Sequence, residues 1–228
     1  MCIRDSAEPC RTFALAVFSS VVIRVSYQDS DTHYTRVARE YKSYSAFSIY
    51  RAKLQDSLER LAQITGTPKA HAQIHLADAR HLDFLAENSV DLIVTSPPYL
   101  NAYDYHKYHR QRLHWIDGDI AMARDMEIGK HDTFSRPHAR PDLYFQDMRT
   151  CFVEWKRVLR LGRRALVVVG DGIVSGEPVP VADRFTVMMG EIGFELENHW
   201  LREILKTNKS FNQNARIDKE HILLYAKS

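Results

Sequence analysis

Two apolar runs constrain the fold of this chain more than any other feature. The residues "VDLIVT" at 90–95 and "ALVVV" at 165–169 are aliphatic and rich in β-branched side chains. Runs of this length and composition predict strands that are buried on both faces. Segments with helical periodicity separate the strands. We therefore predict an α/β fold with a mostly parallel sheet that helices cover on both sides.

The rest of the chain supplies helices and outer strands. Apolar spacing predicts a buried helix or strand at 11–25, a polar loop at 26–36, and helices at 37–64, 147–161 and 181–192, which end at Gly66, Gly162 and Gly193. We also predict strands at 72–76, 194–204 and 221–226. Because a polar loop without a helix joins the last two strands, we expect an antiparallel hairpin at one edge of the sheet.

Composition excludes several classes of protein. The net charge is only +2, so the chain is no general polycation. The longest apolar run, 13–23, is shorter than the roughly 20 residues that a membrane-spanning helix needs. The three cysteines form no CxxC pair, which argues against a disulfide framework and a zinc site and favours the cytoplasm. The histidines have no spacing that predicts a metal site.

Polar residues follow three of the predicted strands. They are Asp78, the tetrapeptide 96–99 and Asp171. In open α/β sheets, ligands bind outside the carboxyl ends of the strands. The sequence therefore predicts a binding site that combines these three positions.

The tetrapeptide Ser96-Pro97-Pro98-Tyr99 has a specific chemistry. Each proline fixes its own φ and holds the preceding residue extended, and neither proline offers an N–H donor. The corner is thus a rigid set of acceptors that suits a ligand with an exocyclic amine. Tyr99 adds a flat face for a base, and such stacking contributes about 1–3 kcal/mol per base. The alternative is a strand terminator with a packed tyrosine.

The segment "DLIVTSPPY" resembles the catalytic strand and loop of the amino-group (N4-cytosine/N6-adenine) DNA methyltransferases that use S-adenosylmethionine. Serine in the first position of the tetrapeptide resembles the N4-cytosine branch. "HLADAR", "GRRALVVVGDG" and the C-terminal strands are similar to further parts of that family, so the resemblance runs from about Leu76 to the C-terminus. It implies a Rossmann-like class I methyltransferase sheet.

The resemblance also implies roles for individual residues. The catalytic residues would be Ser96, Pro97, Pro98 and Tyr99. The residues that bind S-adenosyl-L-methionine would be Asp78, Ala79, Thr95, Ser96, Gly170 and Asp171. The substrate would be DNA with its target base flipped out of the duplex, and a cognate restriction endonuclease would be a partner.

Residues 101–146 form an insertion that we expect to contact DNA. Aromatic and cationic residues interleave in it, and aromatic rings stack on bases whereas cations pair with phosphates. The candidate substrate-binding residues are Asn101, Tyr103, Tyr105, Lys107, Arg110 and Arg112. Two alternatives stay open: the segment is an amphipathic helix packed on the sheet, and Asn101 and Asp104 cap the next helix.

The glycine-rich cofactor loop of that family has no counterpart before residue 78. The only G-x-G is Gly170-Asp171-Gly172, which follows the Ser96 motif. We therefore expect one partial catalytic domain, 1–228, that lacks its N-terminal part; the alternative is a rearranged motif order. Two other functions compete: a methyltransferase for adenine N6, RNA or protein amides on the same fold, and a non-catalytic nucleic-acid-binding remnant.

Overall fold

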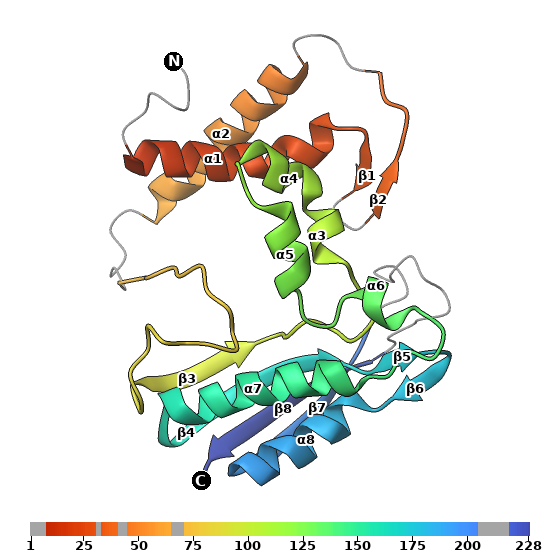
Figure 1. Cartoon of the computed structure of the whole chain (residues 1–228). Coiled ribbons are helices and arrows are strands. Elements are labelled where there is room, and N and C mark those ends of the chain that lie inside the picture. Colours follow the sequence, from red (N-terminus) through yellow and green to blue (C-terminus); the bar gives the residue numbers. More distant parts are fainter. Residues whose placement is uncertain (1–7, 31–32, 41–44, 65–70, 205–218) are drawn as a thin grey trace. The chain divides into compact units, whose positions relative to one another are not determined.

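The computed structural model describes residues 8–30, 33–40, 45–64, 71–204 and 219–228. These residues divide into two compact units, one from residues up to 74 together with 106–125, and one from 75–105 together with 126–228. Figure 1 shows the elements of both units along the chain. The predicted helix end at Gly66 and the polar loop before the last strand lie outside the described residues.

The first unit is helical with one small hairpin. Its elements are α1 (Glu8–Val22), the short 3-10 helix η2 (Ile23–Val25), β1 (Gln28–Ser30), β2 (His33–Arg36), α2 (Ser45–Gln63), most of α3 (Tyr105–Tyr108), α4 (Arg110–Trp115) and most of α5 (Ile120–Met126). Helix α1 packs against α2 and α4. The predicted element at 11–25 is thus a helix. The predicted polar loop at 26–36 is wrong, because β1 and β2 pair there as antiparallel strands.

The second unit contains the main sheet. Its elements are β3 (Val90–Thr95), α6 (His131–Phe134), α7 (Asp142–Val158), β4 (Leu159–Gly170), β5 (Gly172–Val174), β6 (Glu177–Val179), α8 (Val181–Ile192), β7 (Phe194–Glu203) and β8 (Lys219–Lys227). The order of the four-stranded sheet is β3-β4-β8-β7, and β5 pairs with β6 in a separate hairpin.

The sheet is mixed. Strands β3 and β4 are parallel, whereas β4 with β8 and β8 with β7 are antiparallel. The α/β class and the C-terminal antiparallel hairpin are therefore confirmed. The predicted strand at 72–76 is wrong: this segment pairs with no strand among the described residues, and the side chains of Ile74 and Leu76 are 98% and 100% exposed.

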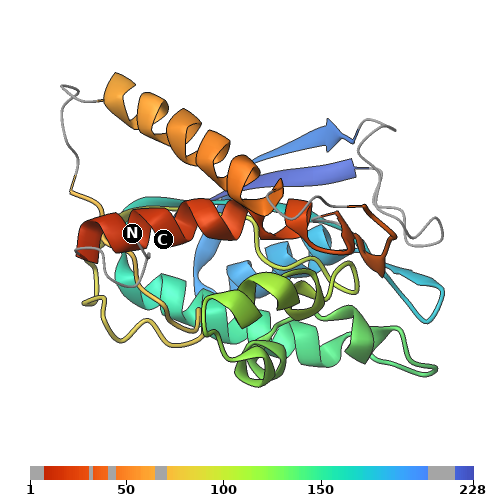
Figure 2. The ribbon, with the colours of Figure 1, turned by 90° about the horizontal axis from the view of Figure 1, so that it is seen from above.

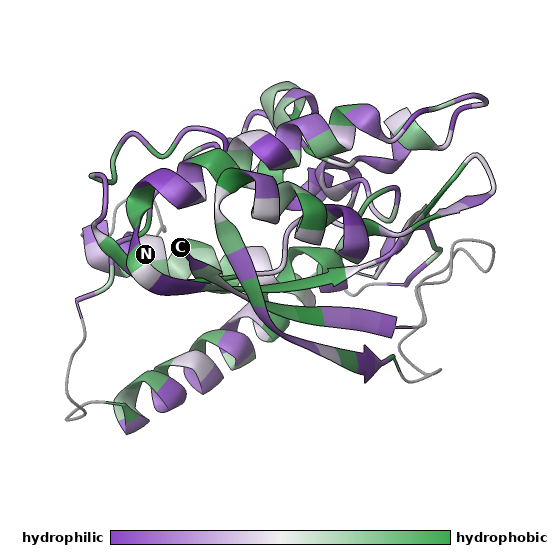
Figure 3. Ribbon diagram, turned by 90° about the horizontal axis from the view of Figure 1, so that it is seen from below, coloured by the Kyte–Doolittle hydropathy of each residue, from purple (hydrophilic) through white to green (hydrophobic). Residues whose placement is uncertain are grey.

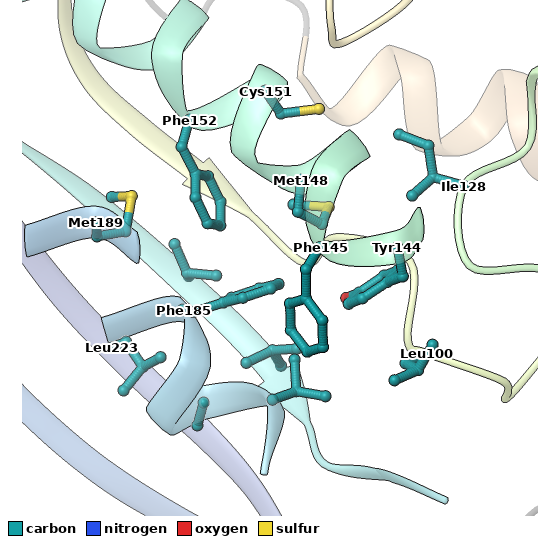
Figure 4. Packing of buried hydrophobic residues seen from close by; sticks show 14 of the residues in the cluster. Leu100, Ile128, Tyr144, Phe145, Met148, Cys151, Phe152, Phe185, Met189 and Leu223 are labelled. Atoms are coloured by element: carbon teal, nitrogen blue, oxygen red, sulfur yellow. The ribbon is translucent and has the colours of Figure 1, made fainter. Parts of the chain in front are cut away.

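Helices α7 and α8 cover one face of the sheet (Figures 1 and 2). Both are amphipathic, and the ribbon shows polar and apolar residues interspersed along them (Figure 3). Their apolar side chains meet those of the strands in one core, in which Phe152, Phe185 and Leu223 are fully buried (Figure 4). Cys151 belongs to this core, and burial raises the pKa of its thiol to about 12.

The sequence predicted that both faces of β3 are covered, but one of its faces is exposed. Successive side chains of a strand point to opposite faces. Ile93 packs against the core, but Leu92 and Val94 are 56% and 64% exposed. The prediction of a strand buried on both faces is therefore wrong for β3.

The helix boundaries differ from the predictions in two places. Helix α2 begins at Ser45 rather than 37, and the described residues 37–40 are not helical. Helix α7 begins at Asp142 rather than 147 and ends at Val158, because Leu159 is already extended and starts β4. Gly162 consequently lies within β4 and is no helix cap. Helix α8 has the predicted bounds. It ends at Gly193, whose left-handed φ of 98° is easy for glycine and lets its N–H bond back to the helix.

Candidate functional site

The polar corner 96–99 lies where β3 ends. Because β3 and β4 are parallel, with Thr95 opposite Val167, their carboxyl ends share one edge of the sheet. Strand β8 runs the other way, and its Glu220 lies opposite Gly170 near the end of β4. The beginning of the last strand therefore meets the corner that follows β3.

Four side chains form a connected hydrogen-bond network at this edge. The Tyr99 hydroxyl donates to Glu220 Oε1 over 2.5 Å, and Ser96 Oγ lies 3.5 Å from the same hydroxyl. Arg202, from β7, donates to Glu220 Oε2 through Nε over 2.8 Å and also through Nη2. Tyr99 is half-buried and Ser96 is exposed. The tyrosine is thus held through its hydroxyl, and the serine beside it is exposed.

The protonation states of Tyr99 and Glu220 in this network follow from their surroundings. Burial opposes ionisation of Glu220, but the hydrogen bonds from Tyr99 and Arg202 prevail and lower the pKa of its carboxyl. Burial and the adjacent Glu220 carboxylate raise the pKa of the Tyr99 phenol. Near neutral pH, Tyr99 is therefore a protonated donor to an ionised acceptor.

The other side of the corner is anchored in the core. Tyr144, from α7, is fully buried and donates its hydroxyl to the Pro98 carbonyl over 2.9 Å. Leu100, which directly follows Tyr99, is also buried. Gly129 has φ +76°, and a Cβ there would come within 3.1 Å of the Tyr144 ring. The corner is consequently fixed from inside by Tyr144 and from outside by Glu220.

Asn101 contains a buried acceptor without a donor. Its φ is +58°, and its Nδ2 donates to the Ile173 carbonyl over 2.6 Å. Its Oδ1 is buried and has no hydrogen-bond partner among the described residues. A helix cap would use this oxygen, so the capping role predicted for Asn101 is wrong.

Asp104 caps a helix other than the predicted one. Its Oδ1 accepts from the Asp132 N–H over 2.9 Å, in the first turn of α6. The first N–H of α3, that of Tyr105, donates instead to Glu127 Oε1 over 2.5 Å.

Asp78 is tied to α7 through an arginine. Its carboxylate accepts from Arg80 Nε and Nη2 over 3.0 and 2.8 Å, and Arg80 Nη1 reaches Asp147 over 2.7 Å. The hydrogen bonds from Arg80 lower the pKa of Asp78 against the opposing effect of burial. Ala79 lies exposed in the turn between these residues.

The segment 170–172 has a structural role in the fold. Asp171 Oδ1 accepts from the Ala182 N–H over 3.3 Å at the start of α8, and its Oδ2 is 3.4 Å from His221 Nε2. A Cβ on Gly172 would come within 3.1 Å of Leu100. This glycine therefore permits the strand to approach the residue that follows the corner.

The candidate DNA-contacting residues are divided between the two units. Tyr103 and Tyr105 belong to the second unit, with ring centroids 5.6 Å apart. Lys107, Arg110 and Arg112 belong to the first. Arg112 donates to the Ser19 carbonyl of α1 over 3.1 Å, so this side chain joins helices within its own unit.

Sequence reasoning missed Glu220 and Tyr144. The signal for Glu220 was present: it lies near the start of an antiparallel terminal strand, and such a residue lies at the same edge as the ends of the parallel strands. Tyr144 was missed because the helix was expected to begin at 147. Among the described residues, no cluster of three His, Cys, Asp or Glu side chains could hold a metal ion. No helix in the described part of the chain is long and apolar enough to cross a membrane.

Comparison with known proteins relates the chain to DNA-modifying enzymes. The family model N6_N4_Mtase, described as DNA methylase, matches residues 90–228. Comparison with curated proteins finds no match. Among solved structures, a protein from Thermus thermophilus named as a DNA modification methylase, in complex with S-adenosyl-L-methionine, is 22% identical with a TM-score of 0.43, and the match covers 67% of this chain and 54% of that one.

A second solved structure is that of a SAM-dependent methyltransferase from Methanosarcina mazei. It is 12% identical with a TM-score of 0.42, and the match covers 77% of this chain and 76% of that chain. The chain spans about half the length of the Thermus protein.

Proposed function

We propose a function from one premise: this chain belongs to the DNA methylase family whose model matches residues 90–228. The proposed reaction transfers a methyl group from S-adenosyl-L-methionine to the exocyclic amine of a base in DNA, with cytosine N4 preferred. The observation that carries the proposal is the exposed Ser96 hydroxyl beside Tyr99, which is itself held by Glu220.

The corner suits an amine that acts as the nucleophile. Ser96 Oγ and the Pro97 carbonyl accept the two N–H bonds, which leaves the lone pair of the nitrogen directed away from the corner. The nitrogen becomes positively charged as its bond to the methyl carbon forms, and acceptors that are already in place stabilise that charge. The Tyr99 ring offers a stacking face, and its hydroxyl bond to Glu220 limits rotation of the ring.

The residues present fit a cofactor that carries amino groups. S-adenosyl-L-methionine has one at its adenine end and one at its methionine end, and the edge of the sheet offers acceptors, among them the partly exposed carboxylate of Asp171. When bound, the cofactor supplies an electrophilic methyl group on a sulfonium. We propose that it is held by the following residues: Asp78, Ala79, Thr95, Ser96, Gly170 and Asp171.

The preference for cytosine N4 rests on serine in the first position of the tetrapeptide. A cognate restriction endonuclease and a cytoplasmic location belong to the same proposal. The proposed DNA contacts are made by the following residues: Asn101, Tyr103, Tyr105, Lys107, Arg110 and Arg112.

Methyl transfer tests the proposal. The chain is incubated with unmethylated DNA of mixed sequence and isotope-labelled S-adenosyl-L-methionine, and the nucleosides are identified by mass spectrometry. We expect label in N4-methylcytosine. Label in N6-methyladenine alone would contradict the preference for cytosine. Absence of label in DNA, with label in RNA or protein offered in parallel, would contradict DNA as the substrate.

A further inference from the structure

The helical first unit contains a cavity of its own. It has a volume of about 730 Å³, is open on one side, and is lined by residues of α1, the hairpin that follows it, the start of α2, and the segment through α3 and α4. All of its lining residues belong to this one unit. The volume lies within the range of roughly 300–1,000 Å³ that is typical of small-ligand pockets.

Aromatic rings supply much of the wall. Phe18 of α1 and Trp115 of α4 line the cavity and meet edge to face, with centroids 6.1 Å apart and planes at 79°. Tyr27 lines it from the segment before β1. Trp115 and Tyr27 are 58% and 50% exposed, so both keep ring surface that a ligand could cover. Exposed aromatic faces of this kind stack on nucleobases.

The charged lining residues are all cations. They are Arg36, Lys107 and Arg110, and no aspartate or glutamate lines the cavity within the described part of the chain. Arg36 lies over the Tyr27 ring, with its guanidinium carbon 5.3 Å from the ring centroid. A cation that stacks on an aromatic ring beside a base-sized space is suited to the phosphate of a nucleotide whose base occupies that space.

We propose that this cavity binds an unpaired nucleotide of a DNA strand, with the base against Trp115 and Tyr27 and the backbone phosphates on Arg36, Lys107 and Arg110. The choice of DNA as the ligand rests on the proposed function. The inference that the cavity binds a nucleotide rests only on its exposed rings and its cations. Most of the wall is apolar, and a purely apolar ligand would make no use of the three cations. A nucleotide satisfies both parts of the lining.

Binding without cofactor tests the cavity. The anisotropy of a short fluorescein-labelled oligothymidine is titrated with the full chain over a range of salt concentrations. We expect Trp115→Ala to weaken binding by about tenfold or more and Trp115→Phe to restore part of the affinity. We expect Arg36→Gln to reduce the slope of log affinity against log salt by about 0.7, the value for one phosphate contact on single strands.

The dependence of affinity on salt distinguishes the loss of a phosphate contact from the loss of folded protein. Loss of structure would lower the active fraction without changing the slope, and circular dichroism monitors the fold of each variant. The matched control is Arg51→Gln, in α2 and outside the lining, which should leave affinity and slope unchanged. Unchanged binding in both Trp115→Ala and Arg36→Gln would overturn the proposal. Equal or tighter binding of an RNA oligonucleotide would overturn DNA as the ligand.

Failure of the cavity proposal can be distinguished from failure of the proposed methyl transfer. Methyl transfer to DNA together with cavity variants that bind normally would remove this inference alone. Binding that depends on Trp115 and Arg36, without methyl transfer by the chain, would remove the proposed reaction alone.

Discussion

Tyr99 and Glu220 are 121 positions apart in the chain and are joined by a hydrogen bond of 2.5 Å. The bond links the residue that closes the corner after β3 to the start of the last strand. Because β8 is antiparallel to β4, these positions meet at the carboxyl edge of the parallel pair. The orientation of the tyrosine thus depends on the C-terminal strand as well as on the prolines that precede it.

The first prediction concerns Glu220. In Glu220→Ala, the Tyr99 hydroxyl and the Arg202 guanidinium lose their shared acceptor, and we expect the free energy of unfolding to fall by about 1–3 kcal/mol. Urea denaturation measures this change. Glu203→Ala removes an exposed carboxylate from the end of β7 and should change stability by less than about 0.5 kcal/mol. Equal effects of the two substitutions would contradict a special role for Glu220.

The second prediction concerns Ser96. Its side chain is exposed, so Ser96→Ala should leave the free energy of unfolding within about 0.5 kcal/mol of the unmodified chain. The amine loses an acceptor that strengthens as charge develops, and we expect methyl transfer to fall by about 10²- to 10³-fold. Ser48→Ala, at an exposed serine of α2, is the control for transfer rate. Full turnover by Ser96→Ala would refute the assignment of the site.

The third prediction compares two buried tyrosines. Tyr144→Phe leaves the Pro98 carbonyl without its donor, whereas Tyr225→Phe removes a hydroxyl that lies 3.1 Å from Thr186 Oγ1. Each loses one buried hydrogen bond, so we expect each to lower stability by about 1 kcal/mol. Only Tyr144→Phe should also slow methyl transfer, because only Pro98 belongs to the corner. A rate loss of the same size in Tyr225→Phe would attribute the effect to general destabilisation.

Local patterns in the sequence predicted the elements whose burial is decided by near neighbours. Helix α8 has the predicted bounds because its apolar face and Gly193 are both local signals. The segment 72–76 has a strand-like pattern but no neighbouring strand to pair with among the described residues, and its apolar side chains are exposed. A strand-like pattern indicates a preference for a pleated, half-buried surface. A strand forms there only where another strand is close enough to pair with it.

The corner itself could be predicted, but its supports could not. Two prolines dictate extended backbone before each of them, so the rigidity at 96–98 follows from covalent geometry. The contacts of Tyr99 with Glu220 and of Pro98 with Tyr144 depend on the strand order and on the start of α7. Neither of these follows from residues near the tetrapeptide. The basic and aromatic segment around Lys107 was predicted to contact DNA, yet its cavity also needs Phe18 from α1 and Tyr27 from the segment before β1.

The last prediction concerns acid. Glu154 of α7 accepts from Arg157 and from the Leu82 N–H, and Arg157 donates to the carbonyls of Leu82 and Leu85. The hydrogen bonds from Arg157 are the main reason that the pKa of Glu154 is lowered from 4.5 to about 2. A carboxyl with a lowered folded-state pKa stabilises the fold above its unfolded pKa, and this contribution is lost as the pH falls through the folded value. We therefore expect the free energy of unfolding to decrease between pH 4.5 and about 2. Glu154→Gln cannot ionise and should show a shallower decrease over that interval, measured by urea denaturation at a series of pH values. An identical pH profile for both chains would show that Glu154 keeps its ordinary pKa in the folded state.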